Sequence, residues 1–339
     1  MTITEFKDSK LTTNSKKRVV SGMRPTGRLH LGHFHGVLEN WIQLQENYEC
    51  FFFVADWHSL TTEYANTQVI KDSVREILID WLAAGVDPQK STLFVQSRVP
   101  EHAELHLLLS MITPISWLER VPSYKELKNE LKDRDLSTYG FLGYPLLQTA
   151  DVAIYQANQV PVGQDQLAHL ELSREVLRRF NYLYGDTFVE PQSMLTASPK
   201  LLGTDGRKMS KSYGNSIYLS DPIAETEKKV MAMMTDPARK KRQDAGNPDI
   251  CPVFDYQKIY NPEKIQSIAQ DCRTAAIGCV DDKKMFLSKL IPFLEQHQAK
   301  RKQYEQNPAL LDQILEEGTA RARKIAQETL KLVYERMKI

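Results

Sequence analysis

Hydrophobic and polar positions alternate between strand-like and helix-like patterns over the first part of the chain. The run RVVSG at residues 18–22 predicts a strand, and the continuous apolar run ECFFFVAD at residues 49–56 predicts a strand buried on both faces. Between them, apolar residues recur every three or four positions from 34 to 42, which predicts a helix with one buried face. The order strand, helix, strand indicates a βαβ unit with parallel strands.

A second unit of the same kind follows directly. Apolar residues recur at helical spacing over residues 67–84, Gly85 supplies a stop, and STLFVQS at residues 91–97 predicts the next strand. The fold class expected from this alternation is α/β, with a doubly wound, Rossmann-like parallel sheet. Such sheets bind ligands at the carboxyl ends of their strands.

The remaining chain predicts helices. Residues 1–17 read as a polar N-terminal tail, and residues 18–220 as the Rossmann-like catalytic domain. Residues 101–160, helical and interrupted by prolines, are expected to be an insertion between the two halves of the sheet. Residues 221–339 predict a separate, charged helical module that ends in a C-terminal helix, with RKKR at residues 239–242 as its densest basic cluster.

Composition narrows the class of protein. Hydrophobic residues make up 42% of the 339 residues, charged residues 26%, and the formal net charge is +1, as in an ordinary globular protein. No apolar run approaches the roughly 18 residues needed to span a bilayer, so no membrane association is expected. The four cysteines are too few for a secreted disulfide scaffold of this size, which favours the cytoplasm.

The loop after the first strand carries three of the eight histidines, His30, His33 and His35. No cysteine or carboxylate at short ligand spacing completes a metal site, and His33 and His35 point to different faces of the helix. Glycine-rich dinucleotide and P-loop motifs are absent. Gly32 permits close approach of a ligand, and His30 and His33 can donate hydrogen bonds to phosphate, so a nucleotide site is expected. His35 has no expected role beyond packing or solvent contact.

A second candidate loop is LLGTDGRKMSKSYGN at residues 201–215. Lys208 and Lys211 lie between glycines that give the loop freedom to move, and mobile lysines can stabilise charge on a departing pyrophosphate. A lone loop of this composition is more often merely solvated. Its occurrence downstream of His-Leu-Gly-His in an α/β chain is far more specific.

These motifs resemble the class I aminoacyl-tRNA synthetases, and within them the tryptophanyl-tRNA synthetases of the bacterial type. The resemblance rests on HLGH, KMSKS, GYPLLQTADVAIYQ and VPVGQDQLAHLELSREV, and covers the chain from about residue 18. It implies a homodimer that uses ATP and Mg2+ to activate L-tryptophan as tryptophanyl-adenylate, and then transfers tryptophan to the 3′ end of tRNA(Trp). It also implies that the helical module binds the tRNA anticodon.

The resemblance carries site residues over position by position. Catalytic roles fall to the two signature motifs through His30, His33, Lys208, Ser210 and Lys211. ATP is expected to contact Arg24, Gly32, Gly163, Asp165, Lys208, Met209, Ser210 and Lys211. Tryptophan is expected to contact Asp151, Gln148, Tyr144, Gln166 and His58. Arg24 stands where many members have glutamine, and a pyrophosphate contact from the insertion is either Lys125 or Lys128.

Asp151 is the residue that favours tryptophan over tyrosine as the substrate. A carboxylate in the apolar stretch PLLQTADVAIY is usually a structural ion-pair or hydrogen-bond partner, but it matches the acceptor of the indole N–H in tryptophanyl enzymes. Tyrosyl enzymes share the fold and both signatures, so a tyrosine-specific synthetase is one alternative. A catalytically silent paralogue that binds tRNA or tryptophan and a small-molecule nucleotidyltransferase are two others.

The cysteines raise a separate question. Cys251, Cys272 and Cys279 resemble an iron-sulfur motif of some tryptophanyl enzymes, but Asp282 stands where the fourth cysteine would be. Because four thiolates are the usual ligands, a degenerate site without a cluster is expected.

Overall fold

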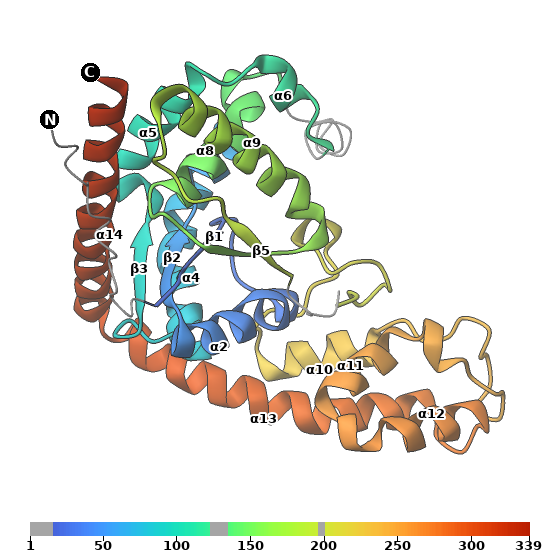
Figure 1. The fold of residues 1–339 in the computed structure, drawn as a ribbon. Helices are drawn as coiled ribbons and strands as arrows, with labels where there is room; N and C mark the ends of the chain where they lie inside the picture. Colours follow the sequence, from blue (N-terminus) through green and yellow to red (C-terminus); the bar gives the residue numbers. More distant parts are fainter. Residues whose placement is uncertain (1–15, 123–134, 196–200) are drawn as a thin grey trace, which may run out of the picture.

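Five parallel strands form the centre of the protein, as the computed structural model shows for residues 16–122, 135–195 and 201–339 (Figure 1). The strands are β1 (Arg18–Met23), β2 (Glu49–Val54), β3 (Ser91–Val95), β4 (Gln159–Val162) and β5 (Gln192–Leu195). They lie in the order β3-β2-β1-β4-β5, and every neighbouring pair is parallel. The order reverses beside β1, which confirms the predicted doubly wound sheet and places its switch point between β1 and β4.

Helices cover the sheet and extend beyond it. Those up to β5 are α1 (Leu31–His33), a π-helical turn (Phe34–Leu38), α2 (Glu39–Asn47), α3 (Asp56–Glu63), α4 (Thr67–Ala84), α5 (Glu101–Ser110), α6 (Ile115–Glu119), α8 (Tyr139–Ala153) and α9 (Leu167–Tyr184). Those after β5 are α10 (Ile223–Ala232), α11 (Pro252–Tyr260), α12 (Ile265–Arg273), α13 (Cys279–Glu305) and α14 (Pro308–Met337). Short 3₁₀ turns join several of them.

Aromatic residues fix the sheet between its helical layers. On one face Phe52 stacks on Trp41 of α2, with ring centroids 4.2 Å apart. On the other face Phe51 stacks on Tyr155, just after α8, at 4.7 Å. Successive residues of a strand point to opposite faces, so a run that is apolar at every position, such as β2, is the pattern of a strand covered on both sides.

The helix predicted for residues 67–84 is α4, and Gly85 ends it in the left-handed conformation at φ 115°. The expected insertion forms α5, α6 and α8 between β3 and β4. Its prolines mark helix starts at Pro100 and Pro114, while Pro145 lies inside α8.

The helical segment after residue 221 is not one separate module. Helices α10 to α13 extend away from the sheet, but α14 returns and runs alongside β3 (Figure 1). Gly318 lies so close to the Leu93 carbonyl that a Cβ there would stand 1.8 Å from its oxygen. Arg321 donates to the carbonyls of Pro88 and Ser91 at 3.0 and 3.5 Å. Apolar residues of α14 at helical spacing, such as Ala322 and Ala326, are buried in the same core cluster as Phe94 of β3, but their pattern does not say which strand the helix meets.

Candidate active site

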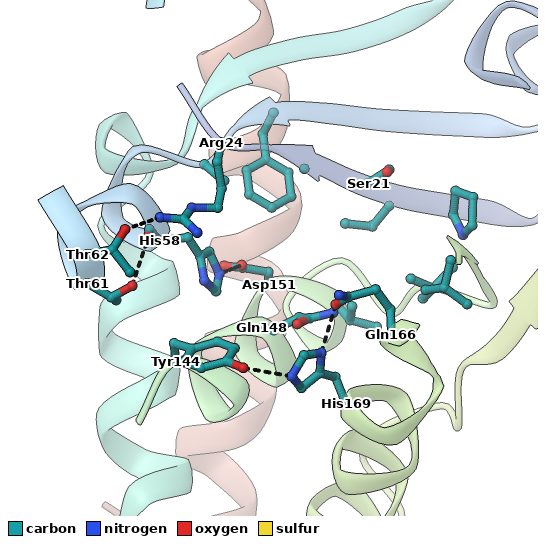
Figure 2. A pocket seen from close by; sticks show the side chains of 18 of the residues that line it. Ser21, Arg24, His58, Thr61, Thr62, Tyr144, Gln148, Asp151, Gln166 and His169 are labelled. Atoms are coloured by element: carbon teal, nitrogen blue, oxygen red, sulfur yellow. Dashed lines mark hydrogen bonds and ion pairs between the residues drawn. The ribbon is translucent and has the colours of Figure 1, made fainter. Parts of the chain in front are cut away.

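A cavity of about 340 Å³ opens at the carboxyl ends of β1 and β4, beside α3 and α8 (Figure 2). All five residues expected to contact tryptophan line it, namely Asp151, Gln148, Tyr144, Gln166 and His58. Apolar groups from β1, β2 and β4 form the opposite wall, which gives the largely apolar lining typical of small-molecule sites. The sequence analysis missed the lining residues Ser21 and Thr61, and no signal at either position distinguishes it from an ordinary surface residue.

Asp151 is the most strongly held group in the cavity. It is 2% exposed, and its Oδ1 accepts hydrogen bonds from Gln96 Nε2 and His102 Nδ1 at 2.7 and 2.6 Å. Its Oδ2 lies 2.7 Å from His58 Nε2. Burial acts to raise the pKa of Asp151, but the hydrogen bonds from His102 and His58 outweigh it and lower the pKa below its ordinary value. Asp151 is therefore a carboxylate at neutral pH.

A second polar chain crosses the cavity between α8 and α9. The Tyr144 hydroxyl lies 3.0 Å from His169 Nε2, and His169 Nδ1 lies 2.7 Å from Gln166 Oε1 (Figure 2). Because only an N–H can donate to the amide oxygen, His169 carries its proton on Nδ1 and accepts from Tyr144. Arg24, expected at ATP, also lines the cavity, where it donates to the Thr62 hydroxyl.

The two histidines of the first signature lie in contact at the start of the helix, with their rings tilted by 43°. Their ring centroids are 3.7 Å apart, and the His30 backbone N–H donates to His33 Nδ1 at 3.2 Å. Burial, followed by the charge of Lys211, lowers the pKa of His30 to about 3, and burial likewise lowers that of His33. Both rings are therefore neutral near pH 7. Since His33 Nδ1 accepts a hydrogen bond, its proton is on Nε2, where it can be donated to a ligand.

The second signature meets the first. Lys211 donates to the Gly27 carbonyl at 2.9 Å, and burial lowers its pKa to about 8. Met209 is buried, and a Cβ on Gly32 would stand 3.7 Å from its sulfur and 3.0 Å from the His30 ring. The described residues thus bring Gly32, His30, Met209 and Lys211 together from positions almost 180 apart in the sequence. Lys208, in contrast, is exposed to solvent.

Asn215 organises this second loop. Its Oδ1 accepts from the Ser210 backbone N–H at 2.8 Å, and its Nδ2 donates to the Lys208 carbonyl at 3.1 Å and to Asp205 Oδ1 at 2.7 Å. A Cβ on Gly203 would stand 2.2 Å from the Asn215 side chain. The sequence analysis missed Asn215. Its place directly after Gly214, a glycine in the left-handed conformation at φ 65°, is the local signal of a tight turn.

Of the other expected ATP contacts, the structure describes only Gly163 in full. Gly163 follows β4 and begins the 3₁₀ turn Gln164–Gln166, so its backbone lies at the edge of the sheet where the ligand cavity opens. The side chain of Asp165 and both candidate lysines, Lys125 and Lys128, lie outside the described residues.

His35 has a structural role that the sequence analysis did not anticipate. It is 4% exposed, lies in the π-helical turn, and its Nε2 is 2.9 Å from the Tyr260 hydroxyl of α11. Its Nδ1 lies 3.0 Å from Glu39. His35 therefore joins the helix of the first signature to the helical region, across 225 positions of sequence.

Cys272 interacts electrostatically with Cys251, Cys279 and Asp282, so these four groups lie near one another. Burial raises the pKa of Cys251 to about 11 and also raises that of Cys272. The carboxylate of Asp282 accepts from Gln257 at 2.7 Å. Over residues 16–122, 135–195 and 201–339, no group of three or more His, Cys, Asp or Glu side chains is placed to hold a metal ion. Because a metal displaces the proton of the thiol that binds it, the raised pKa values do not exclude a cluster, and a degenerate site without one stays a prediction.

In the basic cluster at residues 239–242, the two arginines bond to the backbone and the two lysines are exposed. Arg239 donates to the Ile277 carbonyl at 2.7 Å, and Arg242 donates to the carbonyls of residues 275 and 276. These arginines therefore brace a neighbouring loop. Lys240 and Lys241 are exposed.

Comparison with known proteins identifies the family of the chain. The family model of class I tRNA synthetases (W and Y) matches residues 12–295. The tryptophan–tRNA ligase of Thermotoga maritima is 52% identical over 95% of this chain and 99% of its own length, and that of Aquifex aeolicus is 45% identical over 95% and 100%. The tryptophanyl-tRNA synthetase of Campylobacter jejuni, solved with ADP and tryptophan, superimposes with a TM-score of 0.85 at 30% identity, covering 95% of this chain and 100% of that one. The chain therefore belongs to the class I tRNA synthetases of the W and Y family, among the tryptophan–tRNA ligases.

Proposed function

We propose that the protein activates L-tryptophan with ATP, forming tryptophanyl-adenylate and pyrophosphate, and transfers tryptophan to the 3′ end of tRNA(Trp). The observation that carries this function is the cavity holding the ionised Asp151 beside the contact between the two signature loops. A buried carboxylate at the wall of an apolar cavity suits a flat side chain with one N–H donor. The adjacent histidines and lysines suit a nucleotide triphosphate.

In the activation step, a carboxylate oxygen of tryptophan attacks the α-phosphorus of ATP, and the bond from that phosphorus to the pyrophosphate oxygen breaks. We assign His30 and His33 as neutral hydrogen-bond donors to the phosphates, with Gly32 in close contact with adenine. Lys208, Ser210 and Lys211 stabilise the charge that develops on pyrophosphate. Little covalent chemistry is required of the protein, so positioning and charge stabilisation account for the rate.

Met209, whose side chain lies at Gly32 in the same loop contact, is also assigned to ATP, and Gly163 and Asp165 are assigned to the ribose hydroxyls. Mg2+, when present, would be bound mainly by the ATP phosphates and water, as is usual for this ion, and would neutralise phosphate charge.

Tryptophan is assigned to the cavity with its indole N–H on Asp151 and its ring against Gln148. We assign Tyr144 and Gln166, which are linked through His169, to the amino and carboxyl groups. Arg24 lines the same cavity at the end of β1, which supports a position where the carboxylate of tryptophan meets the α-phosphate.

We assign the anticodon to the helical region α10 to α13, where Lys240 and Lys241 are exposed and can reach phosphate. We propose a homodimer, which is supported by large apolar side chains left exposed after α5 and at the starts of α6 and α8: Met111, Ile115 and Tyr139 are 69%, 64% and 65% exposed. No helix in the described part of the chain is long and apolar enough to cross a membrane. Because bacterial tRNA is charged in the cytoplasm, we place the reaction there.

The test is the exchange of labelled pyrophosphate into ATP with tryptophan, with tyrosine as the control, followed by aminoacylation of tRNA(Trp). We expect exchange with tryptophan alone. Exchange with tyrosine alone would identify a tyrosyl enzyme, and exchange with neither would identify a silent paralogue. Lys211→Ala is expected to abolish most of the exchange, whereas Lys228→Ala, an exposed lysine on α10, is the matched control that retains it.

A further inference from the structure

Two buried polar side chains behind the cavity form a chain that ends on Asp151. The Tyr155 hydroxyl lies 2.7 Å from His102 Nε2, and His102 Nδ1 lies 2.6 Å from Asp151 Oδ1. Tyr155 and His102 are both 0% exposed, and neither lines the cavity. They therefore cannot touch a bound amino acid, although they contact the group that we assign to its recognition.

The direction of each hydrogen bond follows from the protons available. Burial raises the pKa of Tyr155 well above its ordinary value, so its hydroxyl keeps its proton. Asp151 is a carboxylate and can only accept, so His102 Nδ1 carries a proton and donates it to Asp151. In the neutral imidazole Nε2 then carries no proton and accepts from the Tyr155 hydroxyl.

Counting the hydrogen bonds that Asp151 accepts shows how many of its acceptor positions stay open. Its Oδ1 accepts from both His102 and Gln96, and two hydrogen bonds fill the acceptor positions of a carboxylate oxygen. Its Oδ2 accepts from His58 alone among the described contacts and keeps one position. Because Asp151 lines the cavity, this position can receive one donor from a ligand.

We propose that His102 and Tyr155 are positioning residues that determine side-chain specificity: together they orient Asp151 so that one acceptor position faces the cavity. The inference rests on the proposed function, in which Asp151 receives the indole N–H. Selection of an amino acid that donates a hydrogen bond, over one of equal shape that does not, then depends on residues outside the cavity. Loss of the chain frees the carboxylate to turn, so the N–H loses its aligned acceptor.

The test compares two substrates in the exchange reaction. Tryptophan carries the N–H, and 3-(benzothiophen-3-yl)alanine has sulfur in its place with nearly the same shape. The measured quantity is the ratio of their kcat/KM values. Variants are Tyr155→Phe, which keeps the ring that stacks on Phe51, and His102→Leu, which removes the donor to Asp151. His102→Asn is the conservative variant, since its amide nitrogen can occupy the place of Nδ1.

We expect the ratio to fall on the order of tenfold or more in His102→Leu and less in Tyr155→Phe, with most of it restored in His102→Asn. The KM for ATP should not change. Ser173→Ala is the matched control: it removes buried hydrogen bonds to the Thr149 hydroxyl and the His169 carbonyl, 2.9 and 3.0 Å long, neither of which involves Asp151. It should lower the melting temperature without changing the ratio.

The outcomes separate the two claims. If the unmodified protein discriminates strongly but Tyr155→Phe and His102→Leu leave the ratio unchanged, the two residues are only structural and the inference is wrong. If the unmodified protein shows no exchange with tryptophan, the proposed function itself fails. Tyr155→Phe carries the test if His102→Leu does not fold, because it leaves the buried ring in place.

Discussion

Replacing Asn215 by alanine should uncouple the lysine loop from its scaffold without touching the amino-acid cavity. The Asn215 side chain holds two backbone groups of the loop, the Ser210 N–H and the Lys208 carbonyl, at 2.8 and 3.1 Å. Asn215 is 2% exposed, and it is not among the residues lining the cavity. The substitution removes both contacts and leaves the lysines themselves in place.

The two hydrogen bonds to the loop backbone set the minimum size of the effect, because the third, to Asp205, is lost as well. Each contributes about 1 kcal/mol net, so about 2 kcal/mol or more of loop ordering is lost. If the ordered loop is needed only as pyrophosphate departs, this energy raises the activation barrier directly, and a loss of about 2 kcal/mol slows adenylate formation roughly 30-fold. The KM for tryptophan should change little, since the cavity is unaltered.

Single-turnover formation of tryptophanyl-adenylate measures the rate, and pyrophosphate exchange gives both KM values. Gly203→Ala supplies an independent route to the same effect, because its Cβ would stand 2.2 Å from the Asn215 side chain and displace it. Ser212→Ala is the control, since this exposed serine contacts only the Ser210 hydroxyl, at 2.9 Å, among the described bonds. Equal losses in rate and in tryptophan affinity, or a full rate in Asn215→Ala, would refute the reasoning.

Three further outcomes are expected. Because burial lowers the pKa of Lys211 to about 8, its positive charge is lost above that pH, and kcat/KM for ATP should decline above about pH 8. Lys211→Arg should move this decline to higher pH. A decline that stays at the same pH in Lys211→Arg would exclude Lys211 as its source. Replacing Lys240 and Lys241 together by glutamine should reduce the salt slope of tRNA binding by about 1.4 to about 1.8 if both contact phosphate, and an unchanged slope would make them a solvated surface. Tyr260→Phe should lower the free energy of unfolding by about 1–3 kcal/mol in urea titrations, because it leaves buried His35 Nε2 unpaired, and an unchanged midpoint would contradict this role.

Local pattern predicted much of the fold. The helix over residues 67–84 and its stop at Gly85 agree with the structure because amphipathic spacing and a left-handed glycine are local properties. The strand predicted for residues 49–56 ends two residues earlier in the structure, at Val54, and Asp56 begins α3. Docking of α14 was missed, because it depends on which distant strand the helix meets.

In the candidate site too, local motifs were predicted and contacts between distant residues were not. The residues carried over by resemblance, such as Asp151 and Gln166, line one cavity, while partners that hold them in place, such as His102 and His169, were not anticipated. Gln96 lies 55 positions from Asp151, and no periodicity links the two. One signal was available: Gln96 is a polar residue directly after the buried run of β3, at the carboxyl end where such sheets bind ligands.

The docking of α14 also bears on how the protein is made. β3 is an edge strand of the sheet, and the carbonyls of Ser91 and Leu93 face α14 through Arg321 and Gly318. An uncovered edge strand can pair with strands of other chains. During synthesis the ribosome releases the sheet first and residue 318 almost last, so the nascent catalytic domain exposes this edge until translation is nearly complete. Nascent chains stalled before α14 should therefore be the species most in need of chaperones.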